Sequence, residues 1–168
     1  ITSIAKILNY KEVLDIGSGD GRIAYCGKIL GLNAYGIEID NMLVDLQNYI
    51  SKKTVIDFNP ICSDAVTFDY DSLKLTEPAF FIGGLPQMGG DVLASNIISN
   101  LNNNLKEKTC MVLTGSYSEK YSVNDTKDGG WRKLIDDTGL KIIQSNSLPT
   151  VWSFDQTTET PYIFTKFP

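Results

Sequence analysis

Three glycines at alternate positions, directly after a short apolar segment, constrain the fold of this chain more than any other feature. The segment Val-Leu-Asp-Ile is followed by Gly17, Gly19 and Gly21. A chain that leaves a strand and turns at once into a helix needs backbone conformations that a side chain would forbid, and glycine permits them. The pattern therefore predicts a strand at 13–17, a tight turn, and a helix at 22–30.

An acidic residue follows the turn at an informative interval. Glu38 comes 21 residues after Gly17 and lies in a predicted strand at 34–39. In nucleotide-binding α/β folds, an acid about 20 residues after the first glycine accepts hydrogen bonds from ribose hydroxyls. The helix after the turn also offers free backbone N–H groups to a ligand. Together these features predict a pocket for a cofactor that carries a ribose.

The spacing of the glycines separates two classes of nucleoside cofactor. Dinucleotide folds use G-x-G-x-x-G, in which the third glycine permits close helix packing beside a pyrophosphate. Here the third glycine comes one residue early, at Gly21, and Arg22 takes the expected place. This spacing resembles motif I of the class I S-adenosylmethionine-dependent methyltransferases, in which the turn holds the amino-acid end of the cofactor. A structural turn in another kind of α/β protein is the alternative.

The resemblance implies S-adenosylmethionine as the cofactor and assigns its contacts. Asp64, after the third strand, would accept a hydrogen bond from the adenine amino group, with a solvated loop aspartate as the alternative. Ile39 and Met42 would flank the adenine ring, and core packing explains them equally well. Asp15 lies inside a strand, where a carboxylate is costly unless paired. The resemblance gives it N–H groups of the glycine turn, or the cofactor's ammonium, as partners. The implied cofactor-binding residues are Asp15, Gly17, Ser18, Gly19, Gly21, Glu38, Ile39, Asp64, Ala65 and Gly83.

Composition excludes several kinds of chemistry. The chain contains no histidine, which removes Ser-His-Asp triads, histidine acid–base catalysis and most catalytic zinc sites, and no metal site is expected. Its net charge of −5 makes nucleic acid a less favoured partner than a basic substrate. Cys26, Cys62 and Cys110 are odd in number and lie far apart in apolar stretches, which predicts three core residues and a cytoplasmic protein.

Length predicts a single domain over residues 1–168. No apolar run approaches the ~20 residues needed to span a bilayer, so no membrane segment is expected, and no signal peptide is recognised. The chain begins with Ile1 rather than Met, which leaves room for a preceding N-terminal segment.

Alternating strands and helices predict an α/β fold. The expected strands lie at 13–17, 34–39, 59–62, 79–83, 109–114, 140–145 and 162–166, and the expected helices at 1–9, 22–30, 41–52, 91–105 and 131–138. Asp91 is predicted to cap its helix. The predicted inward face of the helix at 41–52 carries Met42, Leu43, Leu46, Tyr49 and Ile50. This pattern, with the resemblance, predicts a Rossmann-like methyltransferase fold: a seven-stranded, mostly parallel sheet with helices on both faces and an antiparallel last strand.

The segment after the fourth predicted strand bears on the methyl acceptor. Enzymes that methylate exocyclic amines of bases or glutamine amides typically carry Asn/Asp-Pro-Pro-Tyr here, and this chain does not. Instead, Gly-Leu-Pro-Gln-Met at 84–88 resembles the Gly-Val-Pro-Gln-Met segment of the ATP synthase c-subunit lysine methyltransferases and their archaeal protein-lysine relatives. Residues 17–23, 36–40 and 151–155 are similar to three further segments of those proteins. The resemblance implies a protein substrate that is methylated on lysine.

Lysine methylation is chemically reasonable without a dedicated base. Deprotonating an amine with a pKa of ~10.4 at pH 7 costs roughly 4.6 kcal/mol. Burial in an apolar channel offsets much of this cost, and positioning contributes ~7–11 kcal/mol. We expect backbone carbonyls of Gly84 and Leu85 to hold the amine, Pro86 to fix the turn, and Trp152 and Phe154 to line the channel. Core packing is the alternative for the two aromatic residues.

Two other functions stay open. Methyl transfer to a small molecule or an RNA is one, because a fold does not determine a substrate. A catalytically inactive S-adenosylmethionine-binding protein is the other. It is suggested by the missing polar residue after the fourth strand and by the glycine pairs at 83–84 and 89–90.

Overall fold

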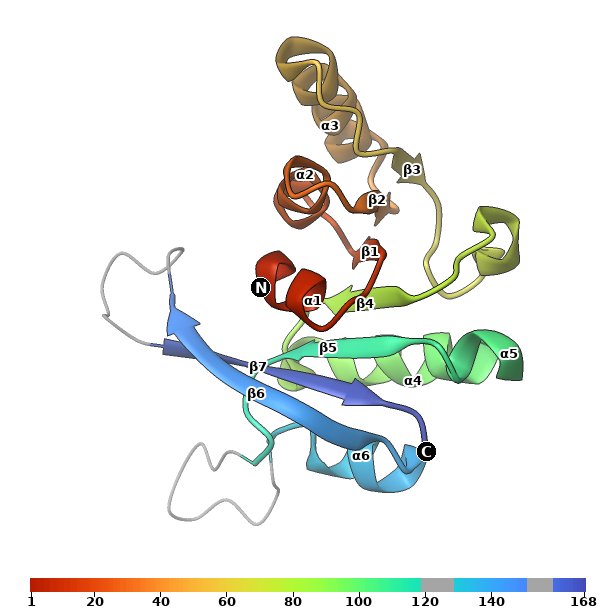
Figure 1. Ribbon diagram of the computed structural model, residues 1–168, viewed down its shortest axis with the longest axis vertical. Helices are drawn as coiled ribbons and strands as arrows, with labels where there is room; N and C mark the ends of the chain where they lie inside the picture. The colour runs from red at the N-terminus through yellow and green to blue at the C-terminus, as the bar shows by residue number, and fades with distance from the viewer. Residues whose placement is uncertain (119–128, 151–158) are drawn as a thin grey trace.

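The computed structural model describes residues 1–118, 129–150 and 159–168, which form one seven-stranded sheet with helices on both faces (Figure 1). The strands are β1 (Glu12–Ile16), β2 (Asn33–Glu38), β3 (Pro60–Cys62), β4 (Pro78–Ile82), β5 (Cys110–Thr114), β6 (Lys141–Pro149) and β7 (Glu159–Lys166). Their order is β3-β2-β1-β4-β5-β7-β6, and β7 alone runs antiparallel to both of its neighbours. The predicted sheet, with its antiparallel last strand, is confirmed.

Two layers of helices enclose the sheet. One layer holds α1 (Thr2–Ile7), α2 (Arg22–Ile29) and α3 (Asn41–Thr54), and the other holds α4 (Gly90–Asn100), α5 (Asn103–Lys106) and α6 (Arg132–Thr138). Successive strand residues point to opposite faces. Accordingly, Val13 packs in one cluster with Ala5 of α1, whereas Leu14 packs in another with Ile97 of α4. In the described part of the chain, none of these helices is long and apolar enough to cross a membrane.

The prediction of which residues of the helix at 41–52 face inward is largely wrong. In α3 the buried residues are Val44 and Gln47, and Leu43 and Ile50 are only half-buried. The exposed residues of the predicted face are Met42, Leu46 and Tyr49. The reason is that α3 covers the edge of the sheet beside the short strand β3, where a polar contact of Gln47 sets the rotation of the helix.

The single helix predicted at 91–105 is divided into two. α4 ends at Asn100, and α5 begins after Asn102, whose side-chain oxygen accepts a backbone N–H of α5 at 2.8 Å. Asparagine favours such caps because its side chain competes with the helical hydrogen bonds. The predicted cap at Asp91 is also wrong, because Gly89, with φ of 89°, precedes the helix and Asp91 lies inside the first turn.

The cysteine prediction is right for one residue of three. Cys110 is buried in β5, whereas Cys26 on α2 and Cys62 at the end of β3 are exposed. Apolar neighbours in sequence do not ensure burial at a sheet edge or on the outer side of a helix. Among the described residues, no group of three acidic or cysteine side chains could hold a metal ion.

Candidate functional site

The glycine turn joins β1 to α2 as the sequence predicts. Gly17, Gly19 and Gly21 have φ of 66°, 56° and 78°, in the left-handed region that favours glycine. Gly21 is the residue before α2, so the free N–H groups of the first helical turn follow it directly. A Cβ on Gly17 or Gly19 would meet no atom within 4 Å. A ligand can therefore lie close against this backbone.

Glu38, at the end of β2, contacts the turn directly. One carboxylate oxygen accepts the N–H of Gly19 at 2.8 Å, and the other accepts those of Ile39 and Asp40 at 2.9 and 3.0 Å. A carboxylate can accept about four hydrogen bonds. The oxygen shared with Gly19 therefore keeps one acceptor position for a ligand hydroxyl. Glu38 and the glycine turn are thus in direct contact, as their spacing in the sequence predicts.

Gln47 of α3 supports the turn, although the sequence pattern does not predict this role. Its side chain is fully buried, and its amide nitrogen donates to Ser18 Oγ at 2.9 Å and to the Gly19 carbonyl at 2.8 Å. A Cβ on Gly36 would lie 2.7 Å from Gln47 Oε1. Glycine in the interior of a strand often marks such a close approach. Gly36, in the middle of a predicted strand, was therefore the signal that could have identified a buried neighbour.

Gln47→Met is expected to lower the free energy of unfolding by about 1–3 kcal/mol, because it removes both hydrogen bonds and leaves buried polar atoms without a partner. Urea denaturation followed by circular dichroism measures the change. Lys52→Met, on the exposed side of the same helix, is the control, with an expected change within about 0.5 kcal/mol. Equal stability of Gln47→Met and the unmodified protein would contradict a structural role for Gln47.

A cavity of about 340 Å³ opens at the carboxyl ends of the central strands. The strand order reverses between β1 and β4, and open α/β sheets bind their ligands at such a switch point. The residues that line the cavity are Ile1, Asp15, Arg22, Ile23, Phe81, Gly83, Thr114 and Tyr162. Two of the predicted cofactor residues, Asp15 and Gly83, are therefore in its wall.

Asp15 is a buried carboxyl group without a cationic partner in the described part of the chain. The N–H of Ala24 donates to it at 3.4 Å, so its backbone partner lies in α2 and not in the glycine turn. Arg22 also lines the cavity, but its guanidinium pairs with Asp20 at 2.6 Å. Burial raises the pKa of Asp15 to about 7. This carboxyl group is suited to a cationic ligand group, which would restore its ordinary ionisation.

The remaining predicted cofactor residues lie along the ends of β2 and β3. Ile39 and Met42 are 71% and 80% exposed, so core packing does not explain them. Asp64 is exposed, and its carboxylate accepts the N–H of Val66 at 2.8 Å, whereas Ala65 is buried. The N–H of Ser63 donates to the Glu38 carbonyl at 2.9 Å, which fixes this loop beside the end of β2.

The segment after β4 turns through the short helix η2 (Pro86–Met88) into α4, with Pro86 at its first position. The Leu85 carbonyl accepts the N–H groups of Met88 and Gly90, both at 3.0 Å. A Cβ on Gly90 would lie 2.1 Å from the Gly84 oxygen. Because a carbonyl has two lone pairs, the Leu85 oxygen is fully engaged. These contacts stabilise the turn, and the role of the two carbonyls in holding an amine stays a prediction.

The predicted aromatic channel residues, Trp152 and Phe154, lie outside the described residues. The loop at 116–130 is described only at its two ends.

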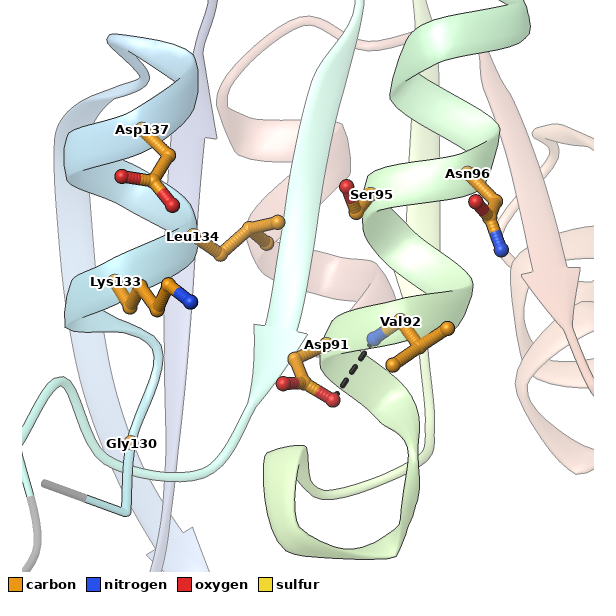
Figure 2. A pocket seen from close by; sticks show the side chains of 8 residues that line it. All are labelled: Asp91, Val92, Ser95, Asn96, Gly130, Lys133, Leu134 and Asp137. Atoms are coloured by element: carbon orange, nitrogen blue, oxygen red, sulfur yellow. Dashed lines mark hydrogen bonds between the residues drawn. The ribbon is translucent and has the colours of Figure 1, made fainter. Parts of the chain in front are cut away.

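A second cavity, of about 230 Å³, lies between α4 and α6 (Figure 2). Figure 2 shows Asp91 and Ser95 of α4 and Lys133 and Asp137 of α6 pointing toward the space between the two helices. These helices cover the opposite face of the sheet from α1 and α2. The second cavity shares no lining residue with the cavity beside Asp15.

Comparison with known proteins assigns the fold. No protein-family model matches the chain, and no curated protein matches it. Solved structures do match. Magnesium protoporphyrin IX methyltransferase from Synechocystis PCC 6803 with bound S-adenosylmethionine has a TM-score of 0.69 and 12% identity over 99% of this chain and 76% of that chain. The glycopeptide N-methyltransferase MtfA gives a TM-score of 0.67 and 10% identity over 99% of this chain and 94% of its own.

A third match supports the same conclusion. An S-adenosylmethionine-dependent methyltransferase from Clostridium acetobutylicum ATCC 824 has a TM-score of 0.65 and 10% identity over 99% of this chain and 89% of its own. At such low identities the likeness concerns the fold alone. The chain therefore has the Rossmann-like fold of the class I S-adenosylmethionine-dependent methyltransferases.

Proposed function

We propose that this protein is an S-adenosylmethionine-dependent methyltransferase that methylates lysine side chains of proteins. The observation that carries the proposal is the placement of the glycine turn, Glu38 and Asp15 along one edge of the sheet, at the point where the strand order reverses. The fold is shared with S-adenosylmethionine-dependent methyltransferases of varied substrates. The lysine acceptor rests on the resemblance of residues 84–88, which begin next to the cavity residue Gly83.

The residues of this edge fit the proposed cofactor. Glu38 has an acceptor position for a ribose hydroxyl, and the exposed side chains of Ile39 and Met42 offer an apolar surface to the adenine ring. Asp15 lines the cavity and has no cationic partner among the described residues, because Arg22 pairs with Asp20, so its carboxyl group is available to the cofactor's ammonium group. When bound, S-adenosylmethionine would supply an electrophilic methyl group on sulfur: a bond from the amine nitrogen to the methyl carbon would form as the carbon–sulfur bond breaks, with that electron pair staying on sulfur.

The chain's own residues would favour the reactive form of an amine. Ile23 and Phe81 form apolar walls of the cavity. An apolar surrounding disfavours the charged form and lowers the pKa of an amine, so the neutral nucleophile becomes accessible near neutral pH. The fixed ends of β1, β4 and β5 hold the walls in place, and positioning of this kind is a large part of catalysis. No additional general base is required in this scheme.

Glu38→Ala is expected to raise the Kd for S-adenosylmethionine by about 10- to 150-fold, the equivalent of one hydrogen bond to a charged group. Isothermal titration calorimetry measures the affinity, and circular dichroism verifies that the variant is folded. Glu107→Ala, at an exposed glutamate after α5, should bind as the unmodified protein does. Undiminished binding by Glu38→Ala would rule out this pocket.

The acceptor is tested by methyl transfer itself. The protein is incubated with radiolabelled S-adenosylmethionine and a cell lysate that has been treated with ribonuclease, with protease, or with neither. We expect label in protein lysines that protease removes and ribonuclease does not. Label that survives protease would assign the acceptor to RNA or a small molecule. Tight cofactor binding without any transfer would contradict an enzymatic function.

A further inference from the structure

Two hydroxyl-bearing residues close the cavity on the side away from the glycine turn. Thr114 is the last residue of β5, and Tyr162 lies directly opposite it on β7. Both line the cavity together with Asp15 of β1. Because β7 runs antiparallel, the start of this strand reaches the same edge of the sheet where β1 and β4 end. The cavity therefore extends from a carboxyl group at β1 to two hydroxyl groups at β5 and β7.

The Tyr162 hydroxyl has no hydrogen-bond partner among residues 1–118, 129–150 and 159–168, although the residue is only 5% exposed and packs with Phe81 and Phe164. Buried tyrosine hydroxyls usually find a partner. Within those residues, the one buried side-chain oxygen or nitrogen without a partner is Gln47 Oε1. The Tyr162 oxygen is therefore in contact with open space, and the open space that this residue lines is the cavity.

The backbone around these two residues is held firmly. The fully buried indole of Trp131 donates from Nε1 to the Thr114 carbonyl at 2.9 Å. The N–H of Gly115 donates to the Pro161 carbonyl at 2.8 Å, which joins the end of β5 to the start of β7. Both side chains therefore start from fixed positions, which a binding group needs.

We propose that Tyr162 and Thr114 form the acceptor subsite, in which their hydroxyl oxygens accept the two N–H groups of a neutral primary amine such as a lysine side chain. This inference rests on the proposed methyltransferase function. A neutral primary amine has two N–H donors and one lone pair. When two hydroxyl oxygens accept the donors, the lone pair stays free for reaction.

Neutral hydroxyl groups suit this task better than a carboxylate. A carboxylate forms stronger, charge-assisted hydrogen bonds to the ammonium form and so favours the unreactive state of the amine. Burial raises the pKa of Tyr162, so its phenol stays neutral. Asp15 lies three strand positions away, about 14 Å at ~4.8 Å per strand. Asp15 and Tyr162 therefore come from strands at opposite ends of the cavity, and in this proposal the two ends hold different groups.

The test uses n-butylamine, which carries the reacting end of a lysine side chain. The protein is titrated with butylamine at pH 9 by calorimetry, with and without saturating S-adenosylhomocysteine, the product of the cofactor. We expect Tyr162→Phe and Thr114→Val each to weaken butylamine binding by about 2- to 10-fold, which corresponds to the loss of one hydrogen bond between neutral groups. The affinity of both variants for S-adenosylhomocysteine should stay within twofold of the unmodified protein.

Tyr49→Phe removes the hydroxyl of an exposed tyrosine on α3 and should leave butylamine binding unchanged. Binding should also strengthen as the pH rises, because the subsite takes the neutral amine. Unchanged butylamine affinity in both Tyr162→Phe and Thr114→Val would overturn the subsite, as would absence of butylamine binding to the unmodified protein. Failure of S-adenosylhomocysteine to bind the unmodified protein would instead contradict the proposed function, while the titration without it still tests the hydroxyl groups.

Discussion

Gly21→Ala is expected to lower the free energy of unfolding by about 2–5 kcal/mol, the sum of backbone strain and overpacking. Gly21 has φ of 78°, a conformation that a residue with a Cβ adopts only at a cost of about 1–2 kcal/mol. The added Cβ would lie 2.6 Å from Phe58 and 3.0 Å from Gln47. Both side chains are fully buried, so neither can move aside freely. Urea denaturation followed by circular dichroism measures the loss.

Gly31→Ala is the matched control for this prediction. Gly31 has φ of 81°, nearly the same as Gly21, but a Cβ there would meet no atom within 4 Å. This variant should therefore show the backbone strain alone, about 1–2 kcal/mol. The difference between the two variants measures the contact of the turn with Phe58 and Gln47. Equal losses in both would show that this packing contributes nothing.

The central strands are the elements that sequence predicts best. β1 and β4 are buried at every position; β4 is a continuous apolar run, and β1 is interrupted only by Glu12 and Asp15. The predicted strand at 13–17 differs from β1 by a single residue at each end. α3 is harder to predict, because its buried residues are Val44 and the polar Gln47, whereas the apolar Met42, Leu46 and Tyr49 are exposed. Hydrophobic periodicity cannot identify a buried face that is fixed by a polar contact.

Within the candidate site, too, the residues fixed by local sequence could be predicted and those fixed by distant contacts could not. The turn and Glu38 could be predicted, because the chemistry of a βαβ unit relates their spacing to their position in space. Gln47 could not, since its partner Ser18 lies 29 residues earlier and the contact depends on helix rotation. Tyr162 meets Thr114 only because β7 returns antiparallel beside β5. The two N–H groups that the Leu85 carbonyl accepts could not be foreseen either, because the chain after β4 folds back to donate them.

Asp15→Asn is expected to stabilise the cofactor-free protein above pH 7 by up to about 4 kcal/mol, the free-energy equivalent of the change in its pKa. The pKa of Asp15 is raised from its usual 3.8 to about 7, chiefly by burial. The folded state therefore binds the proton more tightly than the unfolded state. Stability of the unmodified protein then falls as the pH rises from about 4 to about 7, as the linkage relation requires. Asparagine has no such ionisation, so the stability gap between the two proteins should open over this interval.

Thermal melting of both proteins from pH 4 to pH 8 measures the gap. Asp45→Asn, at an exposed position of α3, is the control and should follow the unmodified protein at every pH. Matching melting temperatures of Asp15→Asn and the unmodified protein at pH 8 would show that the buried carboxylate carries no energetic cost.

The same substitution should have the opposite effect on the proposed cofactor. A carboxylate at Asp15 is the proposed partner of the ammonium group, and loss of one charge-assisted hydrogen bond corresponds to about 10- to 150-fold weaker binding at pH 8. The affinity of the unmodified protein should rise as the pH passes through 7, because Asp15 ionises there, whereas that of Asp15→Asn should not. Calorimetric titration with S-adenosylmethionine at several pH values tests both expectations. A variant that is more stable but binds S-adenosylmethionine less tightly would identify Asp15 as a residue that serves cofactor binding and lowers the stability of the folded protein.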